Sequence, residues 1–292
     1  MRKPLNYSAV LPHKIKMVLV EAFLVFVLGF VVGVPSAMVG LGGGVIIVPA
    51  LVVLFQIPAQ NAIAISLVAI LGTTVSATIG YVRHKQIDYK LGLLYDVMDV
   101  PGIVLGAYIT TLLPENILAG ICGIFILFMT VIFIRNRRKP ACACTEIPGE
   151  SGTREWIRNG IDHKGRAVTY ALKNPAVALA SSFVGGIVTG LAGLGGGITD
   201  VSSMILLGIP THIAVATSEF AMAITNGVGV ATHGLLNNIL IEYAIPITLG
   251  TIIGAQVGCL LAKRVKGKTI RNLLAVIATI SAIRLIIFFF TG

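Results

Sequence analysis

The chain has 292 residues, of which 56% are hydrophobic and 12% charged, and its mean hydropathy is +0.93. A soluble domain carries about a quarter charged residues, so this composition excludes an ordinary soluble globular protein. The formal net charge of +10 does not indicate nucleic-acid binding, because Lys and Arg lie mostly in short loops between apolar stretches, as in the cytoplasmic loops of membrane proteins.

In chain order, the hydropathy pattern predicts an all-α integral membrane protein. Two of its apolar segments, 45–56 and 198–208, are too short to cross a hydrocarbon core of about 30 Å as a helix. Each directly follows a run of glycines, which is typical of a broken or re-entrant helix. The ten segments are 17–39, 45–56, 61–82, 91–113, 117–135, 175–193, 198–208, 213–236, 242–262 and 270–290.

The two halves of the chain read as copies of one unit. The motif Leu41-Gly42-Gly43-Gly44 returns at Leu194-Gly195-Gly196-Gly197, a displacement of 153 positions. Further matches follow in the same order at nearly the same displacement: Ile57-Pro58 with Ile209-Pro210, Ser66 with Ser218, Ile87 with Ile241, and Gly106 with Gly254. The sequence therefore predicts a first transmembrane repeat at 17–135, a cytoplasmic linker at 136–173 and a second repeat at 174–292.

The repeats are predicted to be inverted relative to each other, because an odd number of crossings places equivalent loops on opposite sides of the membrane. Loop 82–90 carries Arg83, Lys85 and Lys90, whereas its counterpart 236–241 carries no Lys or Arg. Ten crossings would put the N-terminus outside, whereas its basic residues favour the cytoplasm, so the number of full crossings stays open.

Non-helical backbone at membrane depth is tolerated only where protein or a water-filled cavity surrounds it. The two glycine turns are therefore expected to face inward. The short helix after each turn begins with free N–H groups and the positive end of its dipole, which favours an anion. We expect the two turns to converge near the midplane and hold one small anion. The alternative is that the glycines serve close helix packing, as expected for Gly29, Gly33, Gly102 and Gly106.

The stretches "GVPSAMVGLGGGVIIVPAL" and "GIVTGLAGLGGGITDVSSMI" resemble the repeat unit of the TauE/SafE family, and the resemblance covers about 17–290. It implies transport of sulfur-containing anions such as sulfite or sulfonates, by export or uptake. The second copy departs from the first where Asp200 and Ser202 replace Ile47 or Val48 and Pro49.

Ionisable residues inside apolar segments are candidates for function. We expect Glu219 and Asp200 to couple transport to protons, because a buried acid repels an anion unless it is protonated. The alternative is a structural carboxylate, for instance one paired with Arg284. Asp96 and Asp99 are expected at the membrane interface.

Hydroxyl and amide side chains could complete the anion's hydrogen bonds. The expected substrate-binding residues are Gly42, Gly43, Gly44, Gly195, Gly196, Gly197, Ser66, Thr217, Ser218 and Asn226. Thr73 and Thr74 are further candidates. Hydrogen bonding of these hydroxyls to their own helix is the alternative.

The function expected from these features is secondary transport of a small sulfur-containing anion. A passive anion channel is the alternative. The chain has no nucleotide-binding P-loop and no catalytic motif, so we expect no enzyme activity, cofactor or metal. Cys142 and Cys144 of the linker are expected to be free thiols, with soft-metal binding or redox sensing as alternatives. The expected partners are the substrate and the lipid bilayer, and a homo-oligomer is left open.

Overall fold

The computed structural model describes residues 7–39, 42–83, 85, 87–135, 156–161, 167–172 and 174–261, and also 279, 282, 283, 286, 287 and 289. The first-half helices are α1 (Tyr7–Val39), α2 (Gly44–Leu54), α3 (Ala59–Arg83), α4 (Tyr89–Leu112) and α5 (Glu115–Arg135). After strands β1 (Trp156–Ile161) and β2 (Ala167–Leu172) come α6 (Pro175–Ala192), α7 (Gly197–Leu206), α8 (Thr211–Leu235) and α9 (Ile241–Leu261).

The described helices coincide with nine of the ten predicted apolar segments to within a few residues, apart from an earlier start of α1. The tenth segment, 270–290, lies largely outside the described residues, and so do Arg284, Cys142 and Cys144. Within the described part of the chain, six helices are long and apolar enough to span a membrane: α1, α3, α4, α6, α8 and α9. Both α2 and α7 are shorter, as expected, because glycine runs precede them and loops follow after eleven and ten residues.

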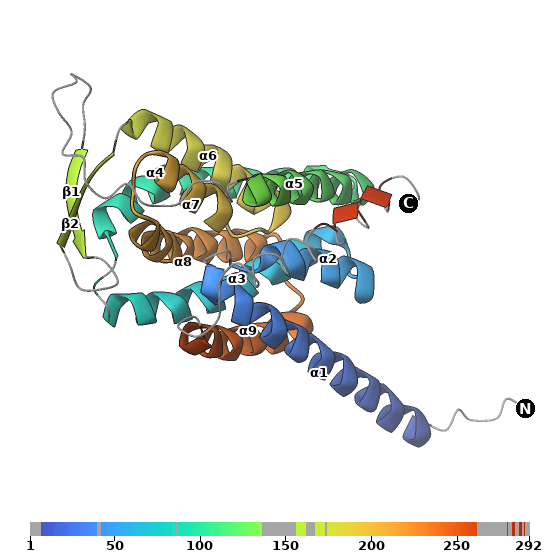
Figure 1. The fold of residues 1–292 in the computed structure, drawn as a ribbon. Helices are drawn as coiled ribbons and strands as arrows, with labels where there is room; N and C mark the ends of the chain where they lie inside the picture. The colour runs from blue at the N-terminus through green and yellow to red at the C-terminus, as the bar shows by residue number, and fades with distance from the viewer. Residues whose placement is uncertain are drawn as a thin grey trace, which may run out of the picture.

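The helices pack so that α3 and α8 lie between two outer pairs (Figure 1). One outer pair is α1 with α9, and the other is α4 with α6. Glycines let the backbones of each outer pair meet: Gly29 and Gly33 of α1 lie against Ile247 and Thr251 of α9. In the other pair, Gly102 and Gly106 of α4 lie against α6 in the same way. These four glycines serve close helix packing, as the sequence predicted.

The linker contributes a β-hairpin that the all-α prediction missed. Strands β1 and β2 pair antiparallel from Trp156 opposite Leu172 to Ile161 opposite Ala167, and the hairpin lies at one end of the helical bundle (Figure 1). Ile157, Val168 and Tyr170 are strand-favouring residues in an otherwise polar linker, and this short signal is weak beside the long apolar segments.

The hairpin is anchored to the helices by a buried tyrosine. The hydroxyl of Tyr170 donates a 2.6 Å hydrogen bond to Oδ2 of Asp88. Asp88 is the N-cap of α4, and its Oδ1 accepts from the backbone N–H of Leu91. The backbone N–H of Asp88 in turn donates to Oγ1 of Thr217 on α8. The linker thus joins the N-terminal end of α4, and through it α8.

Close packing of α9 on α1 predicts a sharp difference between two glycine substitutions. A Cβ on Gly254 would lie 2.5 Å from the carbonyl oxygen of Phe30 on α1, whereas one on Gly80 of α3 would meet nothing within 4 Å. We expect Gly254→Ala to lower the free energy of unfolding by about 1–3 kcal/mol through overpacking. Thermal unfolding of the purified protein in detergent measures this, with Gly80→Ala as the matched control. Equal stability of the two variants would contradict the packing described here.

Candidate anion site

The two glycine motifs adopt left-handed backbone conformations, which glycine permits. Gly42 and Gly43 have φ of 69° and 88°, and Gly43 is the N-cap of α2. In the second motif, Gly195 and Gly196 have φ of 83° and 73°, and Gly196 is the N-cap of α7. Side chains other than glycine rarely adopt these angles. Neither short helix has a side-chain cap at its N-terminus, so the first N–H groups of both are left without that partner.

The two turns lie directly against each other, although about 150 residues separate them in the chain. A Cβ on Gly44 would overlap the carbonyl oxygen of Gly193 in the second turn. Ile70 of α3 fills the space beside both turns, because a Cβ on Gly42 or on Gly195 would lie 2.9 Å from its Cγ2. One isoleucine thus contacts both motifs.

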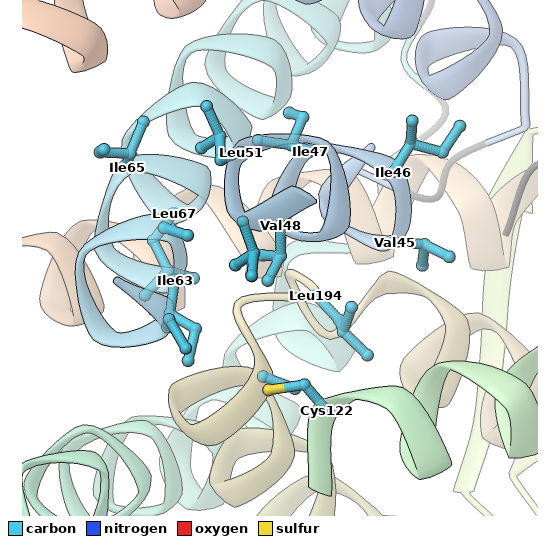
Figure 2. Packing of buried hydrophobic residues seen from close by; sticks show 14 of the residues in the cluster. Val45, Ile46, Ile47, Val48, Leu51, Ile63, Ile65, Leu67, Cys122 and Leu194 are labelled. Atoms are coloured by element: carbon cyan, nitrogen blue, oxygen red, sulfur yellow. The ribbon is translucent and has the colours of Figure 1, made fainter. Parts of the chain in front are cut away.

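The first turn leads into an apolar environment. The first residues of α2 are buried, including Val45, Ile46 and Val48, and Leu194 of the second turn lies beside them (Figure 2). Cys122 of α5 belongs to the same buried hydrophobic cluster as these residues (Figure 2). Its thiol donates to the carbonyl oxygen of Leu191, near the end of α6.

The second turn carries a carboxyl group that the first lacks. Asp200 lies in the first turn of α7, and its Oδ2 would be 3.4 Å from a Cβ on Gly196. The equivalent position of the first copy is Ile47, which is fully buried in the apolar cluster. The departure noted in the sequence therefore makes the two turns electrostatically unequal.

Two further hydroxyl groups border the turns, and sequence reasoning missed them. Oγ of Ser36 on α1 would lie 2.6 Å from a Cβ on Gly43, and Oγ1 of Thr189 on α6 would lie 3.1 Å from one on Gly196. Each also donates to a carbonyl oxygen of its own helix, that of Val32 or Gly185. Ser36 and Thr189 are separated by 153 positions, the displacement of the glycine motif itself, and that match could have identified them.

The predicted hydroxyl residues divide into three groups. Ser66 of α3 donates a 2.8 Å hydrogen bond to the carbonyl oxygen of Gly193 and so contacts the second turn. Thr217 accepts from the backbone N–H of Asp88 and faces α4 instead. Thr73 and Thr74 donate to carbonyl oxygens of their own helix, which is the alternative that the sequence left open.

Ser218 and Asn226 of α8 are fully buried, and neither side chain has a hydrogen-bond partner within the described part of the chain. Glu219 is also 0% exposed, and neither of its carboxyl oxygens has a hydrogen-bond partner among the described residues. Buried polar groups are almost always satisfied. These three side chains therefore have unused hydrogen-bonding capacity.

Asp96 and Asp99, which the sequence predicts at the membrane interface, are buried between helices. They are 5% and 3% exposed, because the face of α4 that carries them packs between α6 and α8. Oδ1 of Asp96 accepts a 2.7 Å hydrogen bond from Thr225 of α8. Tyr95, four positions before Asp99 on α4, shares a 2.9 Å hydrogen bond with Ser203 of α7, which brings the acids of α4 and α7 near each other. Among the described residues, no group of three or more His, Cys, Asp or Glu is arranged to hold a metal ion.

The six apolar helices, with buried polar side chains between them, define a multi-pass membrane protein. The family model described as "Sulfite exporter TauE/SafE" matches residues 25–285. The chain belongs to this family of membrane transporters.

Two relatives from Bacillus subtilis are similar over most of their length. "Probable membrane transporter protein YunE" is 30% identical over 272 residues, covering 90% of this chain and 96% of that protein. "Probable membrane transporter protein YdhB" is 24% identical, covering 80% of this chain and 88% of that protein. "Sulfite exporter TauE/SafE family protein 3" of Arabidopsis thaliana is 34% identical over 107 residues, covering 35% of this chain and 22% of that protein. No solved structure matches the chain.

The bond between Ser66 and the second turn predicts a measurable loss of stability. Ser66→Ala leaves the buried carbonyl of Gly193 without this donor, which we expect to cost about 1–3 kcal/mol. Thr111→Val is the control, because it removes an exposed hydroxyl that donates to Tyr108 within its own helix. Thermal unfolding in detergent compares the two variants. If Thr111→Val lowers the stability as much as Ser66→Ala or more, the hydrogen bond of Ser66 does not hold the turn.

Proposed function

We propose that the protein is a secondary transporter of a small sulfur-containing oxyanion, of the sulfite or organosulfonate class. The observation that carries the proposal is the contact between two glycine turns, each of which opens a short helix without a side-chain cap. Two helix N-termini that face one region offer N–H donors and positive dipole ends to a single anion. The family description and the name of the Arabidopsis relative support the choice of sulfite.

The substrate would bind between the turns, where Gly42–Gly44 and Gly195–Gly197 supply backbone N–H groups. Ser66 contacts this region directly, and Ser218 and Asn226 bring unused polar groups on α8. Because Ile70 packs against both turns, its side chain must move aside before an anion can enter. Alternating movement around this residue would give the site access to each side of the membrane in turn.

We also propose that the two halves are inverted repeats. Helix α1 packs along α9, and its counterpart α6 packs along α4, which is the counterpart of α9. This exchange is what a two-fold axis between the halves produces. The basic loop 82–90 and the neutral loop 236–241 support an axis in the membrane plane, because inversion puts equivalent loops on opposite sides.

Protons are the proposed coupling ion, carried by Glu219 and Asp200. Both are buried, and an ionised carboxylate near the site repels the substrate. A proton removes that repulsion, so acid pH favours anion binding. The chain would then move anion and proton together in whichever direction their combined gradients point.

Flux of labelled sulfite into proteoliposomes tests the function. We expect uptake to increase with an inward proton gradient and to be inhibited by small sulfonates more than by sulfate. Flux that ignores the gradient and carries electrical current would instead indicate a channel. No flux of any of these anions would overturn the substrate class.

Valine in the glycine turns should abolish this flux. Gly43→Val and Gly196→Val place a β-branched side chain at φ of 88° and 73°, where it also projects towards Ser36 or Thr189. We expect less than about a tenth of wild-type flux, since a strained backbone costs of order 1–3 kcal/mol and misaligns the N–H donors. Gly80→Ala should transport normally. Membrane insertion is checked in parallel, and normal flux in both inserted valine variants would exclude the turns as the site.

Glu219→Gln should remove part of the pH dependence of transport. Glutamine resembles the protonated acid, so anion binding no longer requires a proton at this position. We expect flux at alkaline pH to approach the acidic value, as measured in initial-rate assays across a pH series. A pH profile identical to wild type would make Glu219 a structural carboxylate.

A further inference from the structure

The acids of α4 and α7 form a site of their own, separate from Glu219. Asp96 and Asp99 are three positions apart and so share one face of α4. Asp200 approaches that face from α7, whose Ser203, three positions further on, shares a 2.9 Å hydrogen bond with Tyr95 of α4. Gly185 of α6 lies beside it, because a Cβ there would be in ordinary contact, at 3.4 Å, with Oδ1 of Asp200. The three side chains are 5%, 3% and 2% exposed.

Each of these carboxyl groups keeps one buried oxygen without a hydrogen-bond partner: Oδ2 of Asp96, Oδ1 of Asp99 and Oδ1 of Asp200. The basic side chains of the neighbouring loop, Arg83, Lys85 and Lys90, are exposed at the helix ends. Within the described residues, therefore, no cation neutralises the cluster.

Three negative charges cannot be buried together without compensation, because each unpaired buried charge costs several kcal/mol or more. A metal ion would provide that compensation, but the described acids are not arranged as a metal-ligand set. Protons remain, and the unpartnered oxygens are where they would bind.

We propose that Asp96, Asp99 and Asp200 together form the proton-binding site of the transporter, an assignment that rests on the proposed proton–anion coupling. Asp200 connects this site to the anion. Its Oδ2 faces Gly196 at the N-terminal end of α7. When ionised, it occupies the positive end of that helix, and when protonated it leaves that end to the substrate.

The ionised carboxylate of Asp200 and the substrate anion thus compete for one helix end, and a proton on Asp200 favours the anion. Asp96 and Asp99 hold the proton close to Asp200 and couple it to α4, which packs along α6 and α8. Among the described residues, only the second turn has a carboxyl group at this position, because Ile47 occupies the equivalent position after the first turn.

Other groups around the cluster have identifiable partners or lie on different elements. The hydroxyl of Tyr95 shares a 2.9 Å hydrogen bond with Oγ of Ser203 on α7, and Thr225 of α8 donates to Asp96. Helix α6 carries no titratable side chain. Helix α8 also carries the buried residues Glu219 and His233, so the pH profile of the wild type contains their contributions as well.

The test compares two modes of transport in proteoliposomes that contain Asp96→Asn or Asp99→Asn. Wild-type protein should accumulate labelled sulfite about tenfold for each coupled proton and each unit of pH gradient. Both variants should lose this driven accumulation but still exchange internal for external sulfite, because exchange needs no net proton movement. Glu242→Gln, which removes an exposed carboxyl of α9, is the matched control and should keep both modes. Driven accumulation equal to wild type in both aspartate variants would overturn the proposal.

Infrared difference spectra of the purified protein at low and high pH provide a second measurement, which does not depend on the substrate. Wild-type protein should show a protonated-carboxyl band that shifts in heavy water and is reduced in Asp96→Asn, Asp99→Asn and Asp200→Asn. If none of the three variants changes the band, the aspartates do not hold the proton. Intact carboxyl bands together with no sulfite transport in wild type would instead overturn the proposed function and leave the proton site standing.

Discussion

The contact between the two glycine turns is the constraint on which the rest of the structure depends. Gly44 lies against the carbonyl of Gly193, and Ile70 packs against both turns. A Cβ on Gly44 would meet backbone of the second turn, so the two turns could not keep this contact. Because the turns end α1 and α6 and begin α2 and α7, their contact also decides where the four helices around the site begin and end.

Close backbone approach recurs at the two outer helix pairs, α1 with α9 and α4 with α6. Without water, little hydrophobic force drives membrane helices together, so small residues that permit tight van der Waals contact stabilise the pairs. The second pair has an additional task. Gly186 of α6 lies against the backbone of Asp99, so tight packing of α6 on α4 also keeps an acid away from lipid and water.

The two glycine turns differ in the charge of their surroundings. In the first half, the helix after the glycine turn is surrounded by aliphatic side chains (Figure 2). In the second half, Asp200 stands at the equivalent position, beside two acids of α4. Under the proposed mechanism, both turns bind the anion and only the charged turn responds to protons.

Local sequence patterns predicted the positions of the helices, but they did not predict which side chains meet at the candidate site. Hydropathy predicted nine helices to within a few residues, and the glycine runs predicted where two of them begin, because both signals depend on neighbours in the chain. The hairpin at β1 and β2 was missed, since two six-residue strands give a weak pattern within a polar linker. The displacement of 153 also relates Ser36 to Thr189, a match within reach of the sequence that the prediction overlooked.

From the sequence alone it followed that the chain crosses a membrane, where two short helices begin after glycine runs, and which residues near them are ionisable. The packing of distant helices placed Asp96 and Asp99 in the interior, turned Thr217 towards α4, and brought Ser66 to the second turn. The reason is physical: helix formation and membrane insertion depend on residues close in sequence. Which face of each helix becomes the interior depends on contacts between segments more than a hundred residues apart.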